Sequence, residues 1–425
     1  MKNVIKIFIN NKINKSKDKY QKVILLFFLI YIFINSSNII SPNNHDFLFN
    51  NLKNYYIFNQ FACNKSYKLI NKNFTKKQYI EKGLSYFNEI KKKKLNNITK
   101  QINKVPKVSV IIPIYNSEKT IELSVKSVHF QNINDIEIIL INDFSTDNSS
   151  KIIEELNNFD QRILIINNKK NMGTLYSRCI GALNARGEYI IGLDNDDFFL
   201  YEETLETVYL NAKVNNFDIV EIKSLNIFGL NPSYGGIWDG DFTNLPNNLI
   251  LNQPELGRFS ISNNDQLNLR DHFAWGKCIN SDIYKKAVNK LGQQRYSIYN
   301  CWTEDISIVF ILFNTAKSFI FLNIYGIFRF KYSTQTTYKL SNKHKLLSDI
   351  FFLEILFDFS YDDSITKKYV AQYALTFPSE SINKLDINNK SNLKSMIKKI
   401  IECKYISLQY KQKILNKFNN TINDM

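Results

Sequence analysis

Three carboxylates directly follow a short apolar stretch near the middle of the chain. Residues 188–193 (EYIIGL) have the pattern of a buried strand, and Asp194, Asp196 and Asp197 come immediately after it. Side chains at positions i and i+2 of an extended chain point to the same side, so Asp194 and Asp196 are expected to lie together. Carboxylate oxygens are the ligands that hard divalent cations prefer, and such cations bind phosphates. The stretch therefore predicts a site for Mn²⁺ or Mg²⁺ and a diphosphate.

Two earlier apolar stretches also run into polar residues. Residues 108–115 lead into Tyr115 and Asn116, and residues 136–141 lead into Asn142 and Asp143. The carboxyl ends of parallel strands meet at one edge of a sheet, which is where such sheets bind ligands. A single Asp-x-Asp is explained equally well by a turn. Three polar strand ends in order are a more specific signal of one site.

The spacing of apolar residues predicts the elements that position these side chains. We expect strands over residues 108–115, 136–141, 162–166, 188–193 and 218–222, and helices over residues 117–131, 147–159, 172–186 and 201–215. Alternating strands and helices predict an α/β fold with a mostly parallel sheet sandwiched by helices.

Beyond residue 224 the alternation ends. Residues 226–269 are rich in loop-forming residues, and helical patterns return over residues 271–290 and 302–316. Residues 317–330 are apolar and aromatic, and we expect a buried helix–strand pair there. The rest of the chain has the pattern of amphipathic helices with lysine-rich outer faces.

The N-terminal region has the pattern of a membrane anchor. Residues 1–22 are basic, and residues 23–34 (VILLFFLIYIFI) are continuously apolar. A spanning helix needs about 20 residues, which residues 20–40 provide. The basic flank predicts a cytosolic N-terminus and a single-pass type II topology. A cleaved signal peptide and a buried helix are the alternatives.

Composition and charge limit the classes of function that this chain can have. The chain has 425 residues, a net charge of +16 and 44% hydrophobic residues, which suit a globular protein with extensions. Lysine is concentrated in the first ~110 residues and near the C-terminus, so we predict a solvated exterior and no nucleic-acid partner. The five cysteines form no C-x-x-C pair, and the four histidines form no cluster, so no zinc site is predicted.

Four ordered motifs resemble those of family 2 inverting glycosyltransferases, which have a nucleotide-diphospho-sugar-binding sheet of the GT-A type. They are residues 108–116 (VSVIIPIYN), 138–149 (IILINDFSTDNS), 171–174 (NMGT) with Arg178, and 187–197 (GEYIIGLDNDD). The resemblance is close over residues 106–224 and looser to about residue 333. The chain departs from the family where Asn142 and Phe144 replace the usual Asp and Gly, which implies weaker base recognition and a different turn.

The resemblance implies roles for individual residues. Tyr115, with Pro113 and Asn116, would lie at the nucleotide base, and Asp143 would read the base edge. Arg178 would lie near the donor, Asp194 and Asn195 would contact the donor sugar or ribose, and Asp196 would bind the metal together with Asp194. Asp197 would cap the next helix.

A downstream acidic pair supplies the expected base. Residues 302–306 (WTEDI) resemble the family's catalytic segment. Asp305 would be the general base for the acceptor hydroxyl, and Glu304 would orient or replace it. The alternative is that Thr303, Glu304 and Asp305 only cap a helix.

Three further residues resemble acceptor-side or diphosphate positions. Trp275 would stack on a sugar face or pack in the core. Lys277 would meet a phosphate or lie on the surface. Arg329 would close on the diphosphate.

These features predict a metal-dependent hexosyl- or N-acetylhexosaminyl-transferase. Its predicted partners are a nucleotide-diphospho-sugar and a glycan, glycolipid or glycoprotein acceptor. We expect a membrane-bound protein with its catalytic domain in the lumen of the endoplasmic reticulum or Golgi; secretion or the cytosolic membrane face are alternatives. The expected order is a tail (1–22), an anchor (23–40), a stem (41–105), a donor half (106–224), an acceptor half (225–335) and a helical extension (336–425). The alternative function is that of a catalytically inactive binding protein. A nucleotidyltransferase is disfavoured, because it would need an early Gly-rich phosphate loop, which the sequence lacks.

Overall fold

The computed structural model describes residues 105–228, 236–238, 249–259, 262–263, 266–267, 273–297, 303–331 and 341–423. The predicted tail and anchor, and all but the last residue of the predicted stem, lie outside these residues. Within the described ranges, no helix is both long enough and apolar enough to cross a membrane.

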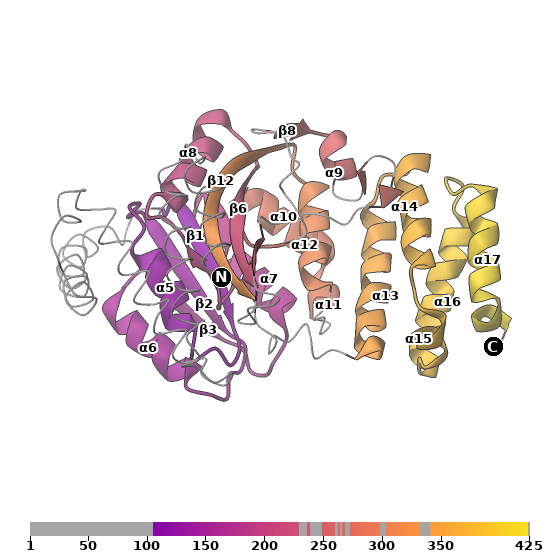
Figure 1. Ribbon diagram of the computed structural model, residues 1–425, viewed down its shortest axis with the longest axis horizontal. Coiled ribbons are helices and arrows are strands. Elements are labelled where there is room, and N and C mark those ends of the chain that lie inside the picture. Colours follow the sequence, from indigo (N-terminus) through magenta and orange to yellow (C-terminus); the bar gives the residue numbers. More distant parts are fainter. Residues whose placement is uncertain are drawn as a thin grey trace, which may run out of the picture.

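A mixed sheet forms the centre of the described chain (Figure 1). Its strands follow the order β3-β2-β1-β4-β11-β6-β12-β5, with β7 paired to β6 and β8 paired to β12. The bounds are β1 Val108–Ile114, β2 Ile136–Asn142, β3 Ile163–Asn167, β4 Tyr189–Gly192, β5 Phe198–Phe199, β6 Ile219–Phe228, β7 Gly236–Trp238, β8 Leu249–Asn252, β11 Lys277–Asn280 and β12 Ser318–Lys331. Strands β9 (Ser262–Asn263) and β10 (Gln266–Leu267) pair separately.

Helices cover both faces of this sheet and continue beyond it (Figure 1). Their bounds are α5 Ile121–His129, α6 Ser149–Phe159, α7 Thr174–Asn184, α8 Thr204–Asn215, α9 Glu255–Phe259, α10 Ser281–Leu291, α11 Gln293–Tyr296, α12 Glu304–Phe313, α13 Asn342–Phe359, α14 Ser364–Leu375, α15 Ser379–Asn383, α16 Ile387–Glu402 and α17 Leu408–Asn423. The sandwiched α/β architecture is therefore confirmed, and so is the helical C-terminal extension, α13 to α17.

Alternating side chains of the strands feed two hydrophobic cores. In β1, Val110 and Ile112 pack with the core under α5, α6 and α8, whereas Ile111 packs with the core under α7, α10 and α12. Every residue of β1 and β2 is buried, as expected for strands covered on both faces. This fixed sandwich holds the carboxyl ends of β1, β2 and β4 at one edge.

The sheet is mixed, so the expected mostly parallel arrangement is correct only for strands β3, β2, β1 and β4 and for the pair β6 and β12. Strands β3, β2, β1 and β4 are parallel, but β11 runs antiparallel to both of its neighbours, β4 and β6. The helix predicted over residues 271–290 is wrong in its first part, because Lys277–Asn280 forms β11. Helix α10 starts only at Ser281, where the Asn280 side chain accepts hydrogen bonds from the backbone of Asp282 and Ile283.

The helix–strand pair predicted over residues 317–330 is also wrong. Ser318–Lys331 is one long strand, β12, which pairs with β6 along its length with register shifts near Tyr325. Gly326 lies so close to the Ile222 side chain that a Cβ atom would approach it to 2.4 Å. The missing side chain therefore allows the strand to continue across a tight contact.

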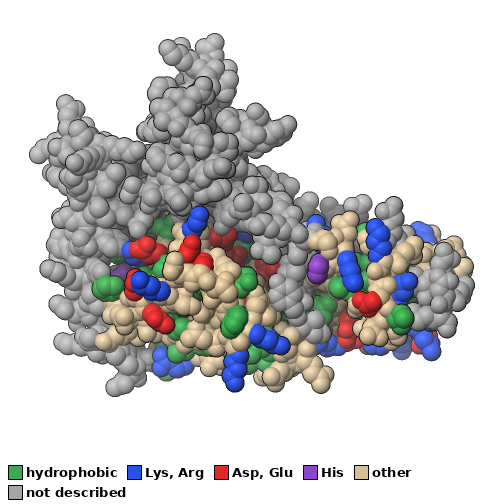
Figure 2. All heavy atoms as spheres, turned by 90° about the horizontal axis from the view of Figure 1, so that it is seen from below, with side chains coloured by type: hydrophobic (Ala, Val, Ile, Leu, Met, Phe, Trp, Pro, Cys, Tyr) green, Lys and Arg blue, Asp and Glu red, His purple; other side chains and the backbone are tan. Residues whose placement is uncertain are grey.

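The helical extension is packed directly against helix α12. Helix α12 is buried from Ile306 to Phe313, and Phe310 meets Phe352 of α13 edge to face. Thr303, the residue before α12, donates a hydrogen bond of 2.8 Å to the Ser348 carbonyl of α13. Lys and Arg side chains appear over the outer surface of the extension (Figure 2), as predicted for amphipathic helices.

Candidate active site

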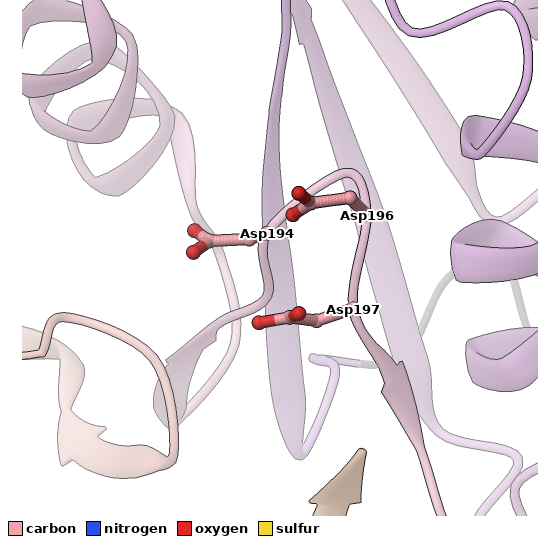
Figure 3. A group of neighbouring side chains, drawn as sticks. All are labelled: Asp194, Asp196 and Asp197. Atoms are coloured by element: carbon pink, nitrogen blue, oxygen red, sulfur yellow. The ribbon is translucent and has the colours of Figure 1, made fainter. Parts of the chain in front are cut away.

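The three carboxylates that follow β4 lie close together. Oxygen atoms of Asp194, Asp196 and Asp197 are all within 4.8 Å of one another. Figure 3 shows their side chains projecting to the same side of the turn between β4 and β5. The turn is held by Ser124 of α5, whose hydroxyl lies 2.8 Å from the Asn195 carbonyl and 2.7 Å from the Asp197 carbonyl.

Arg178 of α7 connects this turn to the start of α12. Its guanidinium donates to Asp194 at 2.6 Å and, through its other terminal nitrogen, to Asp305. The Arg178 side chain is only 5% exposed, and both carboxylates are 24% exposed. The structure thus brings together three residues that were predicted separately as donor, metal and base positions.

The acidic pair at the start of α12 is partly buried beside that guanidinium. Burial, and then the charge of Asp305, raises the pKa of Glu304 to about 7. Burial also raises the pKa of Asp305, while Arg178 opposes that shift. Within the described part of the chain, the Glu304 Oε2 atom is buried without a hydrogen-bond partner. A carboxyl group whose pKa lies near neutrality suits proton transfer.

Asp197 does not cap a helix, contrary to the sequence expectation. It precedes the short strand β5, and its side chain is paired with Arg329 of β12 at 3.1 Å. Arg329 in turn lies over the rings of Trp275 and Phe273, at 4.3 and 4.9 Å from their centroids. Arg329 therefore holds the third carboxylate in place, although the two residues are 132 positions apart in the sequence.

Two of the predicted acceptor-side residues, Trp275 and Lys277, have burial and contacts that indicate structural roles. Trp275 is 2% exposed and stacks on Phe273, which favours core packing over contact with a sugar. Lys277 is 1% exposed and forms an ion pair of 2.7 Å with Glu221 inside the sheet. Neither the phosphate contact nor the surface position expected for Lys277 is correct.

Asp143 is held in place by three hydrogen bonds from the segment before α7. It accepts hydrogen bonds from the backbone of Met172 and Gly173, at 2.8 and 2.7 Å, and from the Asn168 side chain at 2.8 Å. Asp143 is 3% exposed. These contacts order the segment that leads into α7, so its role as a reader of the base edge stays a prediction without support from this geometry.

Asn142, where the chain departs from the family pattern, forms side-chain hydrogen bonds with three neighbouring residues. Its amide nitrogen donates to Ser150 and Asn167, both at 2.9 Å, and its oxygen accepts from the Ser145 backbone at 3.1 Å. A carboxylate at this position offers no N–H donors for Ser150 and Asn167.

Phe144 adopts a backbone conformation that favours glycine. Its φ is +63°, in the left-handed region, and Asn116 on the neighbouring turn has φ +48°. The expectation of a different turn stays a prediction; the chain holds a bulky residue in a conformation that favours glycine. This costs roughly 1–2 kcal/mol of backbone strain. Phe144 is 52% exposed, and Tyr115 beside it is 47% exposed.

The predicted donor residues at β1 are positioned by hydrogen bonds. Asn195 donates to the Pro113 carbonyl at 2.9 Å, which ties the β4 turn to the end of β1. Asn116 accepts from the Thr146 backbone at 2.8 Å and donates to Ser145 at 3.1 Å. Pro113, Asn116 and Asn195 thus shape the sheet edge.

The donor set fits a divalent cation. Among the described residues, five carboxyl groups gather here with two guanidinium groups, those of Arg178 and Arg329. Burial, and then the charges of Asp196 and Asp194, raise the pKa of Asp197 well above its ordinary range even though Arg329 opposes the shift, which reflects the electrostatic cost of crowding buried carboxylates. A bound cation would relieve that cost, and oxygen donors are what Mn²⁺ and Mg²⁺ prefer.

Comparison with known proteins agrees with the fold and with the family resemblance of the sequence. The profile of glycosyl transferase family 2 matches residues 109–287. A cholesterol galactosyltransferase of Borreliella burgdorferi is 31% identical over 314 residues, which cover 69% of this chain and 81% of that protein. Glycosyltransferase GlyA of Streptococcus pneumoniae is 28% identical over 203 residues, 45% of this chain and 27% of that protein.

Solved structures share the fold. S. aureus TarS 1–349 in complex with UDP-GlcNAc has a TM-score of 0.53 and 16% identity, and the match covers 75% of this chain and 91% of that one. Together with the sequence relatives, this makes the chain a member of glycosyltransferase family 2 with a GT-A-like fold. It is an enzyme that transfers sugars.

Proposed function

We propose that the enzyme moves a sugar from a nucleotide-diphospho-sugar to an acceptor hydroxyl, with inversion and with the help of a divalent metal. One observation carries the proposal: Arg178 joins Asp194, beside the metal-type carboxylates, to Asp305, the candidate base. The same guanidinium therefore sets the base at a fixed place relative to the donor site.

Each group has a distinct task in this proposal. Asp194, Asp196 and Asp197 would hold the cation, and Arg329 keeps Asp197 in place. When bound, the metal supplies positive charge that stabilises the departing nucleoside diphosphate. Arg178 holds Asp194 and Asp305 together, and its positive charge favours the ionised form of Asp305.

The reaction is a displacement at the anomeric carbon. The acceptor oxygen forms a bond to that carbon from one face while the bond to the diphosphate oxygen breaks on the other. Asp305 accepts the proton of the acceptor hydroxyl, and the electron pair of the broken bond leaves on the diphosphate. Glu304, buried next to Asp305, orients it or takes its place.

The acceptor is proposed from chemistry and from the relatives. A glycan, glycolipid or glycoprotein hydroxyl suits the reaction, and so does a lipid alcohol, since the Borreliella relative is named for cholesterol. TarS has been solved with UDP and with UDP-GlcNAc, so uridine donors carrying hexoses or N-acetylhexosamines are the first to test.

The test is transfer or hydrolysis from a panel of nucleotide sugars with Mn²⁺, comparing wild type with Asp196→Ala and Asp305→Asn. We expect turnover in the wild type and loss of at least about a hundredfold in both variants. Asp196→Ala should also weaken Mn²⁺ binding in calorimetry, whereas Asp305→Asn should not. Absence of both turnover and metal-dependent nucleotide binding in the wild type refutes the proposal.

We also propose that residues 23–40 attach the enzyme to a membrane, beside a lipid-linked acceptor. The length and apolar character of this stretch support the proposal. The full chain should sediment with membranes after an alkaline carbonate wash, and a chain that begins at residue 41 should not. Equal release of both proteins contradicts it.

A further inference from the structure

Helix α5 and the residues just past its end bury three polar side chains on one face. Ser124, Ser127 and Gln131 are each at most 1% exposed. Their spacing of three and four residues places them on the same side of the helix. A buried hydroxyl or amide is unfavourable unless hydrogen bonds replace those that it makes with water. This polar face of α5 is therefore expected to bind particular groups of a neighbouring segment.

The Ser124 hydroxyl binds the turn that carries the three carboxylates. It lies 2.8 Å from the Asn195 carbonyl and 2.7 Å from the Asp197 carbonyl. A hydroxyl has one proton, so two backbone carbonyls of the turn converge on a single donor. The Asp197 backbone also donates to the Asp194 carbonyl at 3.1 Å, which closes the turn on itself. Removing the hydroxyl would leave the turn closed but detached from α5 at this point.

The other two side chains of the polar face hold the chain beyond the turn. The Ser127 hydroxyl accepts a hydrogen bond of 3.1 Å from the Phe199 backbone in β5. The Gln131 amide donates to the Tyr201 carbonyl and accepts from the Leu205 backbone, both at 2.9 Å. The polar face thus binds the segment that follows β4 at several successive points, all of them backbone groups.

This segment needs such support because β5 is the last strand in the order of the sheet. On the side of β12, the Leu200 backbone donates to the Gly326 carbonyl at 2.9 Å. The Phe199 backbone, one residue earlier, donates to Ser127 of α5 instead. The polar face of α5 therefore takes the place of a further strand at this edge.

We propose that Ser124 is a positioning residue for the divalent cation, which it serves by holding the backbone of Asn195 and Asp197. The inference rests on the proposed function, since it assumes that Asp194, Asp196 and Asp197 bind a metal. Their oxygen atoms lie within 4.8 Å of one another, although like charges repel. Without the hydroxyl, binding a cation would also require the turn to be reordered, which lowers the affinity.

The experiment measures Mn²⁺ binding to the full chain by calorimetry, with and without UDP, and records a thermal melt of each protein. Ser124→Ala removes the hydroxyl, and Ser127→Ala removes the contact two residues further along the segment. Ser109→Ala is the matched control. Ser109 is equally buried and donates to Glu137 at 2.6 Å, but it lies at the amino end of β1.

We expect Ser124→Ala to bind Mn²⁺ about tenfold more weakly than the wild type, the lower end of the effect of residues that orient metal ligands. Ser127→Ala should weaken binding by about threefold, because it acts one step further from the carboxylates. Ser109→Ala should keep the wild-type affinity for Mn²⁺, although its melting temperature should fall because it loses a buried hydrogen bond.

Two results overturn the inference. One is an unchanged Mn²⁺ affinity in Ser124→Ala or, if that variant does not fold, in Ser127→Ala. The other is an equal loss of affinity in Ser109→Ala, which would make general stability the cause. Failure of the proposed function looks different. In that case the wild type binds no Mn²⁺, alone or with any of UDP, GDP, ADP, CDP and dTDP, and the inference fails with it.

Discussion

Arg178 is the residue that makes one site out of two segments. It lies on α7, and its two terminal nitrogens reach a carboxylate after β4 and another at the start of α12. A guanidinium can form two directed hydrogen bonds at once, whereas an ammonium group acts as a single point of charge. The geometry of the guanidinium group, and not only its charge, should therefore matter for catalysis.

We predict that Arg178→Lys lowers kcat/KM by about a hundredfold or more. Lysine keeps the positive charge but cannot hold Asp194 and Asp305 in their present relation, and small displacements of reacting groups have large effects on rate. Steady-state kinetics with the identified donor measures the effect, and circular dichroism confirms that the variant is folded.

Arg162→Lys is the matched control for that change. Arg162 makes a similar two-atom contact with Asp160, at 2.9 and 2.7 Å, but at the amino end of β3. It should leave kcat/KM within about threefold of wild type. Equal losses in the two variants would mean that Arg178 acts through stability alone.

Glu304 should make stability depend on pH. Its folded pKa of about 7 lies above the ordinary value of 4.5, because of burial and then the charge of Asp305; Arg178 and Asp194 also act on it. The folded protein therefore binds this proton more tightly than the unfolded chain does. The stabilisation is complete below about pH 4.5, is lost as the pH rises toward 7, and changes little above that.

We predict that Glu304→Gln removes this dependence. Between pH 5 and 7.5 the wild type should lose stability relative to the variant, by at most on the order of 3 kcal/mol. Urea unfolding at a series of pH values measures the difference, with Glu354→Gln as the control for a half-exposed carboxyl. Parallel pH curves for wild type and Glu304→Gln would refute the assignment.

Single residues at the strand ends could be predicted from the sequence, but their partners could not. Asp194, Asp196 and Asp305 follow from local patterns and family resemblance, since each stands next to a recognisable strand or helix. The contact between Arg178 and Asp305 spans 127 positions and depends on how α7 and α12 pack. The left-handed backbone of Phe144 was likewise hidden, because the residue type argues against it.

Helix α12 is the element that carries the candidate base, and a helix of the extension holds it in place. Its first turn presents Glu304 and Asp305, and the Thr303 hydroxyl just before it is bound to the Ser348 carbonyl of α13. The contact is buried, and the loss of one such hydrogen bond typically costs about 0.5–1.5 kcal/mol. The first turn should then become less well ordered.

We predict that Thr303→Val lowers kcat about tenfold while KM for the donor changes little. The donor is held by the carboxylates after β4, whereas the base depends on the first turn of α12. Thr303→Ser keeps the hydroxyl and should restore kcat. Thr315→Val removes a comparable hydroxyl at the other end of α12 and should leave kcat unchanged. A rise in KM alone would contradict this role.

Among the elements, local sequence patterns predicted the strands of the first half of the sheet. They did not predict strands whose conformation depends on the strands beside them. Strands β1, β2 and β4 are buried apolar runs whose order and direction follow from the α/β alternation. Strand β11 was mistaken for part of a helix, because only its place between β4 and β6 makes Lys277–Asn280 extended. Its buried lysine depends on Glu221, a partner in another strand.

The whole molecule consists of a catalytic α/β half and a helical extension that share one hydrophobic core. Buried side chains of α12 continue into those of α13 and α14 without a break. Arg295 of α11 adds a link across the same boundary, with hydrogen bonds to Glu354 at 3.0 Å and to Asp358. The extension is thus part of the catalytic domain in physical terms.

We predict that deleting residues 342–425 abolishes folding of the rest. The deletion removes the buried side chains of α13, of which Phe352 contacts Phe310 of α12; five of them are Leu346, Ile350, Phe352, Leu353 and Leu356. At about 2 kcal/mol each they contribute about 10 kcal/mol, comparable to the 5–15 kcal/mol net stability of a typical domain.

Deleting only residues 408–425, which contain α17, should instead lower the melting temperature and spare activity. Size-exclusion chromatography and thermal melting distinguish the two. A cooperatively melting, active protein ending at residue 341 would show that the catalytic half folds independently of the extension.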